Sequence, residues 1–208
     1  GVIGHLNSGT TIPASKIYSD AGVPQISPSA TNPKYTRNGY KTAFRVVADD
    51  VHLGGTLGKY SVTTLKGKSI AVIDDRTAYG QGVADEFEKG VKAAGGKLVG
   101  REFTTDKATD FTGILTAIKG VRPDVVFYGG MDATAGPMIK QARELGIKST
   151  FAFGDGACTS EMTKLGGPAA EGLICSQAGI PTQMASKSFQ DAFKAKYGEV
   201  KQYAPFFY

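Results

Sequence analysis

Loops that follow predicted strands carry groups able to bind both ends of a zwitterion. Residues 7–11 and 27–31 are rich in hydroxyl groups and contain no charged side chain. Hydroxyls and backbone amides at the start of a helix suit a carboxylate, which accepts several hydrogen bonds at once. Asp155 lies between two glycines, which allow close approach of the backbone, and its carboxylate suits an ammonium group. A carboxylate-binding loop opposite an ammonium-binding aspartate is what an α-amino acid would need.

Two further loops follow predicted strands in the same way. Residues 74–80 lead into a predicted helix through Tyr79, and residues 129–132 contain Met131. In open parallel sheets, ligands bind beyond the carboxyl ends of the strands, where all these loops lie. Serine, threonine, aspartate and glycine are also common at helix N-caps and turns. Spacing alone therefore leaves a ligand site and ordinary capping as alternatives.

Residues suited to catalysis or metal binding are sparse. The chain has two histidines: we expect His5 to be a core residue within a strand and His52 to be solvated in the first turn of a helix. Neither forms a metal-ligand spacing with a cysteine or a carboxylate. The segment 80–85 superficially resembles a dinucleotide loop but has Asp85 where a third glycine would pack. We therefore predict that the protein is not an enzyme and has no catalytic residue, cofactor or metal site.

The composition is that of an ordinary globular protein. The formal net charge is +5, and the basic residues are scattered singly, so neither nucleic-acid binding nor membrane insertion is predicted. No run approaches the roughly 20 apolar residues that a membrane helix needs. The two cysteines, Cys158 and Cys175, could form a disulfide in an exported protein or be unrelated buried thiols. No signal peptide is recognisable, so these residues leave the compartment open.

Short β-rich runs alternate with amphipathic helical segments, which predicts an α/β fold with parallel sheets covered by helices. The predicted strands are 2–5, 23–27, 43–47, 69–73, 97–103, 124–128, 150–153 and 172–176. The predicted helices are 11–21, 49–65, 79–94, 111–119, 133–145, 159–165 and 188–197. We expect residues 48–178 to form one doubly wound lobe, and residues 1–47 and 179–208 to form part of a second lobe. The chain opens within a strand and closes on the aromatic run 203–208, as a piece of a longer protein would.

Six segments, in this order, closely resemble the leucine/isoleucine/valine-binding protein family. They are VIGHLNSGTT at 2–11, ISPSATNP at 26–33, TAYGQG at 77–82, FYGG at 127–130, QARELG at 141–146 and AAEG at 169–172. Members of this family are type I periplasmic binding proteins, in which two doubly wound parallel-sheet lobes close on a ligand by a hinge motion. The resemblance also implies that this chain is truncated, with one lobe incomplete, and that the piece alone binds ligand weakly.

The resemblance implies a role for each matching residue in the first lobe. Ser8 and Thr31 would hold the ligand carboxylate, helped by backbone amides near Gly9 and Thr31. The main-chain carbonyl of Ser29, which precedes Ala30, would meet the ammonium together with the Thr31 hydroxyl.

The resemblance also implies ligand-binding roles for residues of the second lobe. Asp155 would pair with the ammonium across the cleft, and Tyr79 would cover the ligand. Met131 takes a position that is often tyrosine in leucine binders, and Asp132 follows it. This departure leaves the specificity open to polar or shorter ligands such as γ-aminobutyrate or glycine. The family also supports pairing Cys158 with Cys175 in an oxidising periplasm.

The resemblance therefore implies the substrate-binding component of an ABC importer, which delivers an amino acid to a membrane permease from the periplasm. Two alternatives share the same lobes: a ligand-sensing receptor or regulator, and a fragment of an engineered amino-acid sensor. A receptor or regulator would be attached to a membrane or DNA-binding segment, and a sensor fragment would be flanked by foreign sequence.

Overall fold

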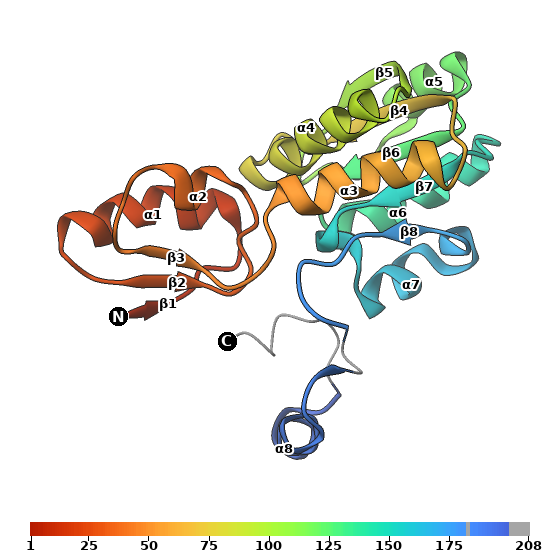
Figure 1. Cartoon of the computed structure of the whole chain (residues 1–208). Coiled ribbons are helices and arrows are strands. Elements are labelled where there is room, and N and C mark those ends of the chain that lie inside the picture. The colour runs from red at the N-terminus through yellow and green to blue at the C-terminus, as the bar shows by residue number, and fades with distance from the viewer. Residues whose placement is uncertain (182–183, 200–208) are drawn as a thin grey trace. The chain divides into compact units, whose positions relative to one another are not determined.

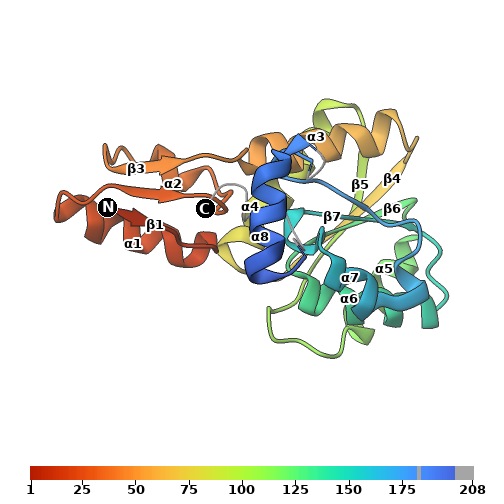
Figure 2. The same ribbon diagram turned by 90° about the horizontal axis from the view of Figure 1, so that it is seen from below.

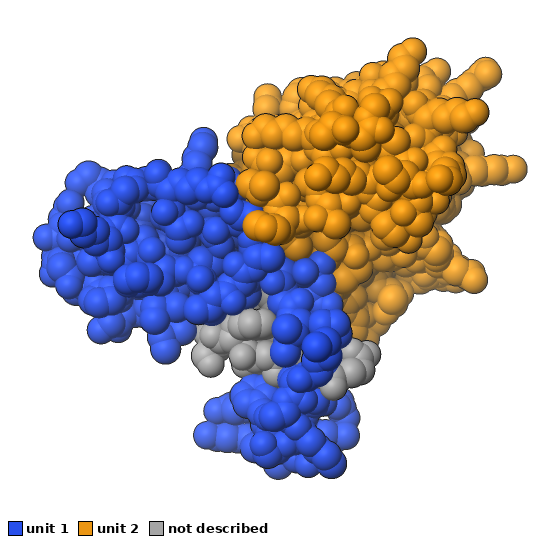
Figure 3. All heavy atoms as spheres, viewed as in Figure 1, with its two compact units in different colours: residues 1–49, 177–208 blue, residues 50–176 orange. Residues whose placement is uncertain are grey.

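The computed structural model describes residues 1–181 and 184–199, and the chain divides into two compact units (Figure 3). Unit 1 comprises Gly1–Asp49 and Gln177–Tyr208, and unit 2 comprises Asp50–Ser176. The aromatic run 203–208 lies outside the described residues. Among the helices of the described part, none combines the length and apolar character needed to cross a membrane.

Unit 1 is built on a parallel sheet with the strand order β1-β2-β3 (Figure 1). Its elements are β1 (Val2–Ile3), α1 (Ser8–Asp20), β2 (Gln25–Ser27), α2 (Lys34–Arg37), β3 (Ala43–Arg45) and α8 (Lys187–Tyr197). Tyr35 of α2 is fully buried, and its hydroxyl donates to the backbone carbonyl of Gln25 at 3.0 Å. Gln25 and Ser27 are buried on either side of the exposed Ile26, as the alternation of a strand requires.

Unit 2 contains a second parallel sheet with the order β5-β4-β6-β7-β8. Its strands are β4 (Ser69–Asp74), β5 (Lys97–Phe103), β6 (Val125–Gly129), β7 (Thr150–Phe153) and β8 (Ile174–Cys175). Its helices are α3 (Asp50–Thr63), α4 (Ala78–Ala93), α5 (Thr112–Val121), α6 (Asp132–Glu144) and α7 (Ser160–Gly166), with 3-10 turns η1 (Asp155–Ala157) and η2 (Gly167–Ala170). Because β5 and β6 lie on opposite sides of β4, the sheet is doubly wound.

Helices cover both faces of the unit 2 sheet. Phe111, the N-cap residue of α5, Leu115 of α5 and Met138 of α6 pack with alternate sheet residues such as Tyr128 and Phe153. Figure 2 shows α7 beside α6. On the other face, Phe87 of α4 stacks on Phe127 of β6 with ring centroids 4.1 Å apart. The two central strands β4 and β6 are almost wholly buried, which explains their continuous apolar character.

Helices α3 and α4 lie so close together that glycine is required at their crossing (Figure 1). A Cβ at Gly58 would lie 2.2 Å from the backbone oxygen of Phe87, and one at Gly54 would lie 2.3 Å from that of Val83. A Cβ at Gly90 would lie 2.2 Å from the backbone oxygen of Gly55. The packing is therefore backbone against backbone, and it fixes the helix whose first turn carries Tyr79.

Each strand and longer helix predicted within the described residues is present, with bounds shifted by a few residues. Helix α1 begins at Ser8 instead of residue 11, because Asn7 already has the extended backbone of an N-cap. The single turns α2, η1 and η2 were not predicted, since they are too short to show helical periodicity.

The prediction that His5 is a core strand residue is wrong. β1 ends at Ile3, and His5 is half-buried in the following loop with its Nε2 3.2 Å from the Tyr18 hydroxyl. His52 is exposed in the first turn of α3, as predicted.

Candidate ligand-binding site

The start of α1 supplies hydrogen-bond donors in unit 1. Ser8 follows the N-cap Asn7, whose side chain makes no capping hydrogen bond, and the first N–H groups of a helix have no partner within it. Ser8 is 1% exposed, and its Oγ accepts a hydrogen bond from the backbone N–H of Asn32 at 3.2 Å. Since Oγ accepts there, its own proton can be donated to an anion. Gly9 adds an exposed backbone with open space around its Cα.

Ser27, at the end of β2, shapes the loop that carries the other predicted residues of unit 1. Its Oγ donates to the backbone carbonyl of His5 at 2.8 Å and accepts from the N–H of Ala30 at 2.9 Å and of Ser29 at 3.4 Å. The amide of Ala30 is therefore engaged within the protein, and its methyl group is buried. The sequence placed Ser27 in the hydroxyl-rich segment 27–31 but did not assign it a role of its own.

Thr31 follows this turn with its hydroxyl in an unusual state. The residue is 1% exposed, and within the described part of the chain its Oγ1 is buried without a hydrogen-bond partner. Burying a hydroxyl without a partner costs free energy, so Oγ1 is available for a ligand atom. Thr31 also precedes Asn32, which bonds to Ser8. The predicted residues of unit 1 thus gather at one place, at the carboxyl ends of β1 and β2.

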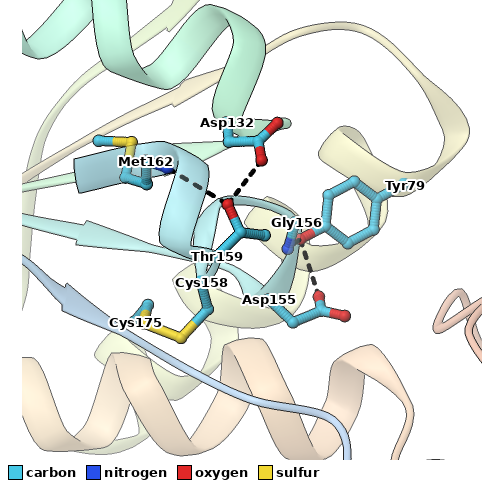
Figure 4. The surroundings of a disulfide bond; sticks show 8 residues. All are labelled: Tyr79, Asp132, Asp155, Gly156, Cys158, Thr159, Met162 and Cys175. Atoms are coloured by element: carbon cyan, nitrogen blue, oxygen red, sulfur yellow. Dashed lines mark hydrogen bonds between the residues drawn. A yellow bond between two sulfur atoms is a disulfide. The ribbon is translucent and has the colours of Figure 1, made fainter. Parts of the chain in front are cut away.

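The predicted residues of unit 2 gather around Gly156, at the carboxyl ends of β4, β6 and β7. The Tyr79 hydroxyl, from the first turn of α4, donates to Asp155 Oδ1 at 2.8 Å and accepts from the N–H of Gly156 at 2.8 Å (Figure 4). A Cβ at Gly156 would lie 2.7 Å from Met131 Sδ and 2.9 Å from Tyr79 Cε1. Met131 and Tyr79 therefore both pack on this glycine, and Asp155 lies beside them.

Burial and charge determine the protonation of this cluster. Tyr79 is 7% exposed and Asp155 is 9% exposed. Burial raises the pKa of the Tyr79 hydroxyl well above its ordinary value, and the negative charge of Asp155 raises this pKa further. The hydroxyl consequently keeps its proton at neutral pH and donates it to the carboxylate.

The turn that carries Asp155 is anchored at its far end. Cys158 forms a disulfide with Cys175 of β8, with 5.5 Å between the Cα atoms, so the predicted pairing is confirmed (Figure 4). The next residue, Thr159, donates to Asp132 Oδ2 at 2.6 Å, and its Oγ1 caps α7 by accepting from the N–H of Met162. Asp132 therefore holds the turn. The sequence did not reveal this contact, because it joins two separate loops.

The loop before Tyr79 is shaped by two buried carboxylates. Asp75 Oδ1 accepts from the N–H and hydroxyl of Thr77, and Thr77 Oγ1 in turn accepts from the N–H of Gly80 as the N-cap of α4. Burial raises the pKa of Asp75, and the hydrogen bonds from Thr77 oppose this rise. Asp74 pairs with Arg101 of β5, which also binds Glu88 of α4. Asp75 and Thr77 therefore position the start of α4, and Arg101 links β4 to the later part of that helix.

Within the part of the chain that the structure describes, no group of three or more histidine, cysteine, aspartate or glutamate residues could hold a metal ion. The geometry is that of two sets of binding groups, one in each unit, at the carboxyl ends of parallel strands. A family model described as a periplasmic binding protein matches residues 1–208. The chain belongs to the periplasmic binding protein family.

Known periplasmic binding proteins resemble the chain in sequence and in structure. A Leu/Ile/Val-binding protein homolog of Brucella suis is 41% identical over 173 residues, which are 83% of this chain and 47% of that protein. The leucine-binding protein LivK of Thermotoga maritima superimposes with a TM-score of 0.91 at 27% identity, covering 99% of this chain and 59% of that one. LivJ of Streptococcus pneumoniae, solved with isoleucine, superimposes with a TM-score of 0.84 at 29% identity, covering 100% of this chain and 60% of that one.

These comparisons confirm the predicted fold class, a type I periplasmic binding protein with parallel-sheet lobes. They also confirm the predicted family. The chain spans about half the length of the curated relatives it matches. The similar proteins are binding proteins by name and not enzymes.

Proposed function

We propose that this periplasmic binding protein captures a small amino acid, branched-chain or related, as the substrate-binding component of an ABC importer. The observation that carries the proposal is the buried carboxylate of Asp155, held by Tyr79 at the carboxyl end of β7. Asp155 lies beside Tyr79 and Met131 at the carboxyl ends of parallel strands, where ligands bind in open α/β sheets. A carboxylate at this position suits a ligand ammonium.

The groups of unit 1 suit the opposite end of the same ligand. Ser8, the amides near Gly9 and the buried hydroxyl of Thr31 offer donors to a carboxylate, and the carbonyl of Ser29 offers an acceptor to the ammonium. We propose that the two units close on the ligand by a hinge motion, which brings both sets of groups to one zwitterion. Binding and release require no bond to be made or broken, so the proposed activity is not enzymatic.

Met131 would contact the side chain of the ligand. Its thioether packs on Gly156, next to Tyr79. Methionine is unbranched and adapts to different apolar shapes, which suits leucine, isoleucine and valine. Met131 is half-buried beside Asp132, so a shorter or more polar ligand such as glycine or γ-aminobutyrate remains part of the proposal.

The proposed partner is the membrane permease of the importer, and the proposed compartment is the periplasm. The names of the similar proteins support both, since they include a branched-chain amino-acid transporter substrate-binding protein. The disulfide between Cys158 and Cys175 is consistent with an oxidising compartment. No role for nucleic acid or for insertion into a membrane is proposed.

Titration calorimetry with leucine, isoleucine, valine, glycine and γ-aminobutyrate tests this function, with this sequence measured within the full-length protein because the chain spans about half the length of its curated relatives. We expect one of them to bind, and Asp155→Asn to weaken that binding at least about 100-fold, because it leaves the ammonium without its counter-charge. Asp106→Asn, which removes an exposed carboxylate of the same unit, is the matched control and should leave the affinity unchanged. Failure of every amino acid to bind, or equal affinities for the Asp155→Asn variant and the unchanged chain, would overturn the proposal.

A further inference from the structure

The Tyr79 hydroxyl is engaged by the turn that carries Asp155. Its side chain is 7% exposed, and its hydroxyl lies between Asp155 Oδ1 and the N–H of Gly156, each at 2.8 Å. A Cβ at Gly154 would lie 2.5 Å from the same hydroxyl oxygen. The hydroxyl thus lies against the backbone of the turn 154–156.

The two hydrogen bonds of Tyr79 act on the same short turn in different ways. The bond donated to Asp155 restrains the carboxylate, and Figure 4 shows only one of its two oxygens turned toward the Tyr79 hydroxyl. The bond accepted from Gly156 restrains the backbone one residue further on. A hydrogen bond to a charged group is stronger than one between neutral groups, so the bond from Tyr79 gives the carboxylate one preferred orientation. At the other end of the turn, the disulfide of Cys158 holds the chain to β8.

We infer that Tyr79 is a positioning residue, which orients the Asp155 carboxylate so that its other oxygen meets the ligand ammonium. This inference rests on the proposed function, since it assigns the ammonium to Asp155. It changes the role that the family resemblance implies for Tyr79, from covering the ligand to selecting ligands that carry an ammonium group. Preorganising a charged group in this way improves affinity because the carboxylate loses less rotamer freedom on binding.

The test compares a ligand that has the ammonium with one that lacks it. Leucine and 4-methylpentanoate differ only in this group, and each is titrated against the unchanged chain, Tyr79→Phe, Asp155→Asn and the double variant. Tyr79→Phe should weaken leucine about 10-fold, which corresponds to about 1.4 kcal/mol, and leave 4-methylpentanoate unchanged. In the Asp155→Asn background, Tyr79→Phe should have no further effect on leucine, because it acts through the carboxylate.

Tyr128→Phe is the matched control. Tyr128 is also a buried tyrosine of unit 2, and its hydroxyl lies 2.7 Å from Thr134 Oγ1 and not beside Asp155. Both Phe variants lose one buried hydroxyl together with its hydrogen bonds, two at Tyr79 and one at Tyr128, so a general loss of stability would appear in both. Only Tyr79→Phe should change the ratio of the leucine and 4-methylpentanoate affinities.

The outcomes separate this inference from the proposed function. If Asp155→Asn leaves leucine binding intact, the proposed function fails. If Asp155→Asn weakens leucine binding as expected but Tyr79→Phe does not alter the affinity ratio, the positioning role alone is overturned. Should Tyr79→Phe not fold, 3-fluorotyrosine placed at position 79 makes the hydroxyl a stronger donor at nearly the same size. It should then change the affinity for leucine and not for 4-methylpentanoate, and equal changes for both ligands would overturn the inference.

Discussion

Replacing Gly58 by alanine should destabilise unit 2 although alanine is the better helix former. The new Cβ would lie 2.2 Å from the backbone oxygen of Phe87 and 2.8 Å from the backbone nitrogen of Val91, whereas ordinary contact begins at 3.4 Å. Helices α3 and α4 would have to part by about 1 Å, which loses dispersion contacts along the whole crossing. Overpacking of this kind costs about 1–3 kcal/mol or more, and the helix preference of alanine returns up to about 1 kcal/mol. We expect a net loss of about 2 kcal/mol.

Gly55→Ala is the matched control, because it makes the same substitution in the same helix. A Cβ at Gly55 would lie 3.9 Å from the backbone oxygen of Glu86, so it fits without movement. Here only the helix preference acts, and we expect a gain of about 0.5–1 kcal/mol. In urea unfolding followed by far-UV circular dichroism, the midpoint of Gly58→Ala should therefore lie below that of the unchanged chain, and the midpoint of Gly55→Ala above it. A Gly58→Ala variant as stable as the unchanged chain would refute the close packing of α3 on α4.

Two further predictions concern the stability of unit 2. Replacing both Cys158 and Cys175 by serine should lower the free energy of unfolding by about 3 kcal/mol, since the disulfide closes a loop with a sequence separation of 17. Chemical reduction of the unchanged chain should give the same urea midpoint as the double-serine variant. A loss below about 1 kcal/mol would contradict this expectation. Asp124 accepts hydrogen bonds from the backbone N–H groups of Ser69 and Lys68, which hold its pKa below the ordinary value of 3.8. Its stabilising contribution is therefore present above pH 3.8 and is lost as the pH falls through the lower pKa of the folded state. The difference in melting temperature between the unchanged chain and Asp124→Asn should shrink on acidification, and a constant difference from neutral to acid pH would argue against this role.

The sequence predicted the repeated strand–helix pattern because local physics decides it. The strands β4 and β6 are nearly continuous apolar runs, and such runs are stable only when both faces of the sheet are covered. The candidate site was predictable in outline for the same reason, since loops at the carboxyl ends of parallel strands meet at one edge. The disulfide could be proposed because the chain has two cysteines, and the family resemblance favoured their pairing.

The orientation of individual side chains depends on the tertiary structure. Tyr79 and Asp155 are separated by 76 positions, and their contact exists because β4 and β7 lie on either side of β6. Nothing local to Tyr79 shows that its hydroxyl faces a carboxylate. The buried hydroxyl of Thr31 likewise follows from the turn that Ser27 holds. Residue types and strand ends were thus set by the sequence, whereas hydrogen-bond partners between distant loops were decided by the order of strands in the sheet.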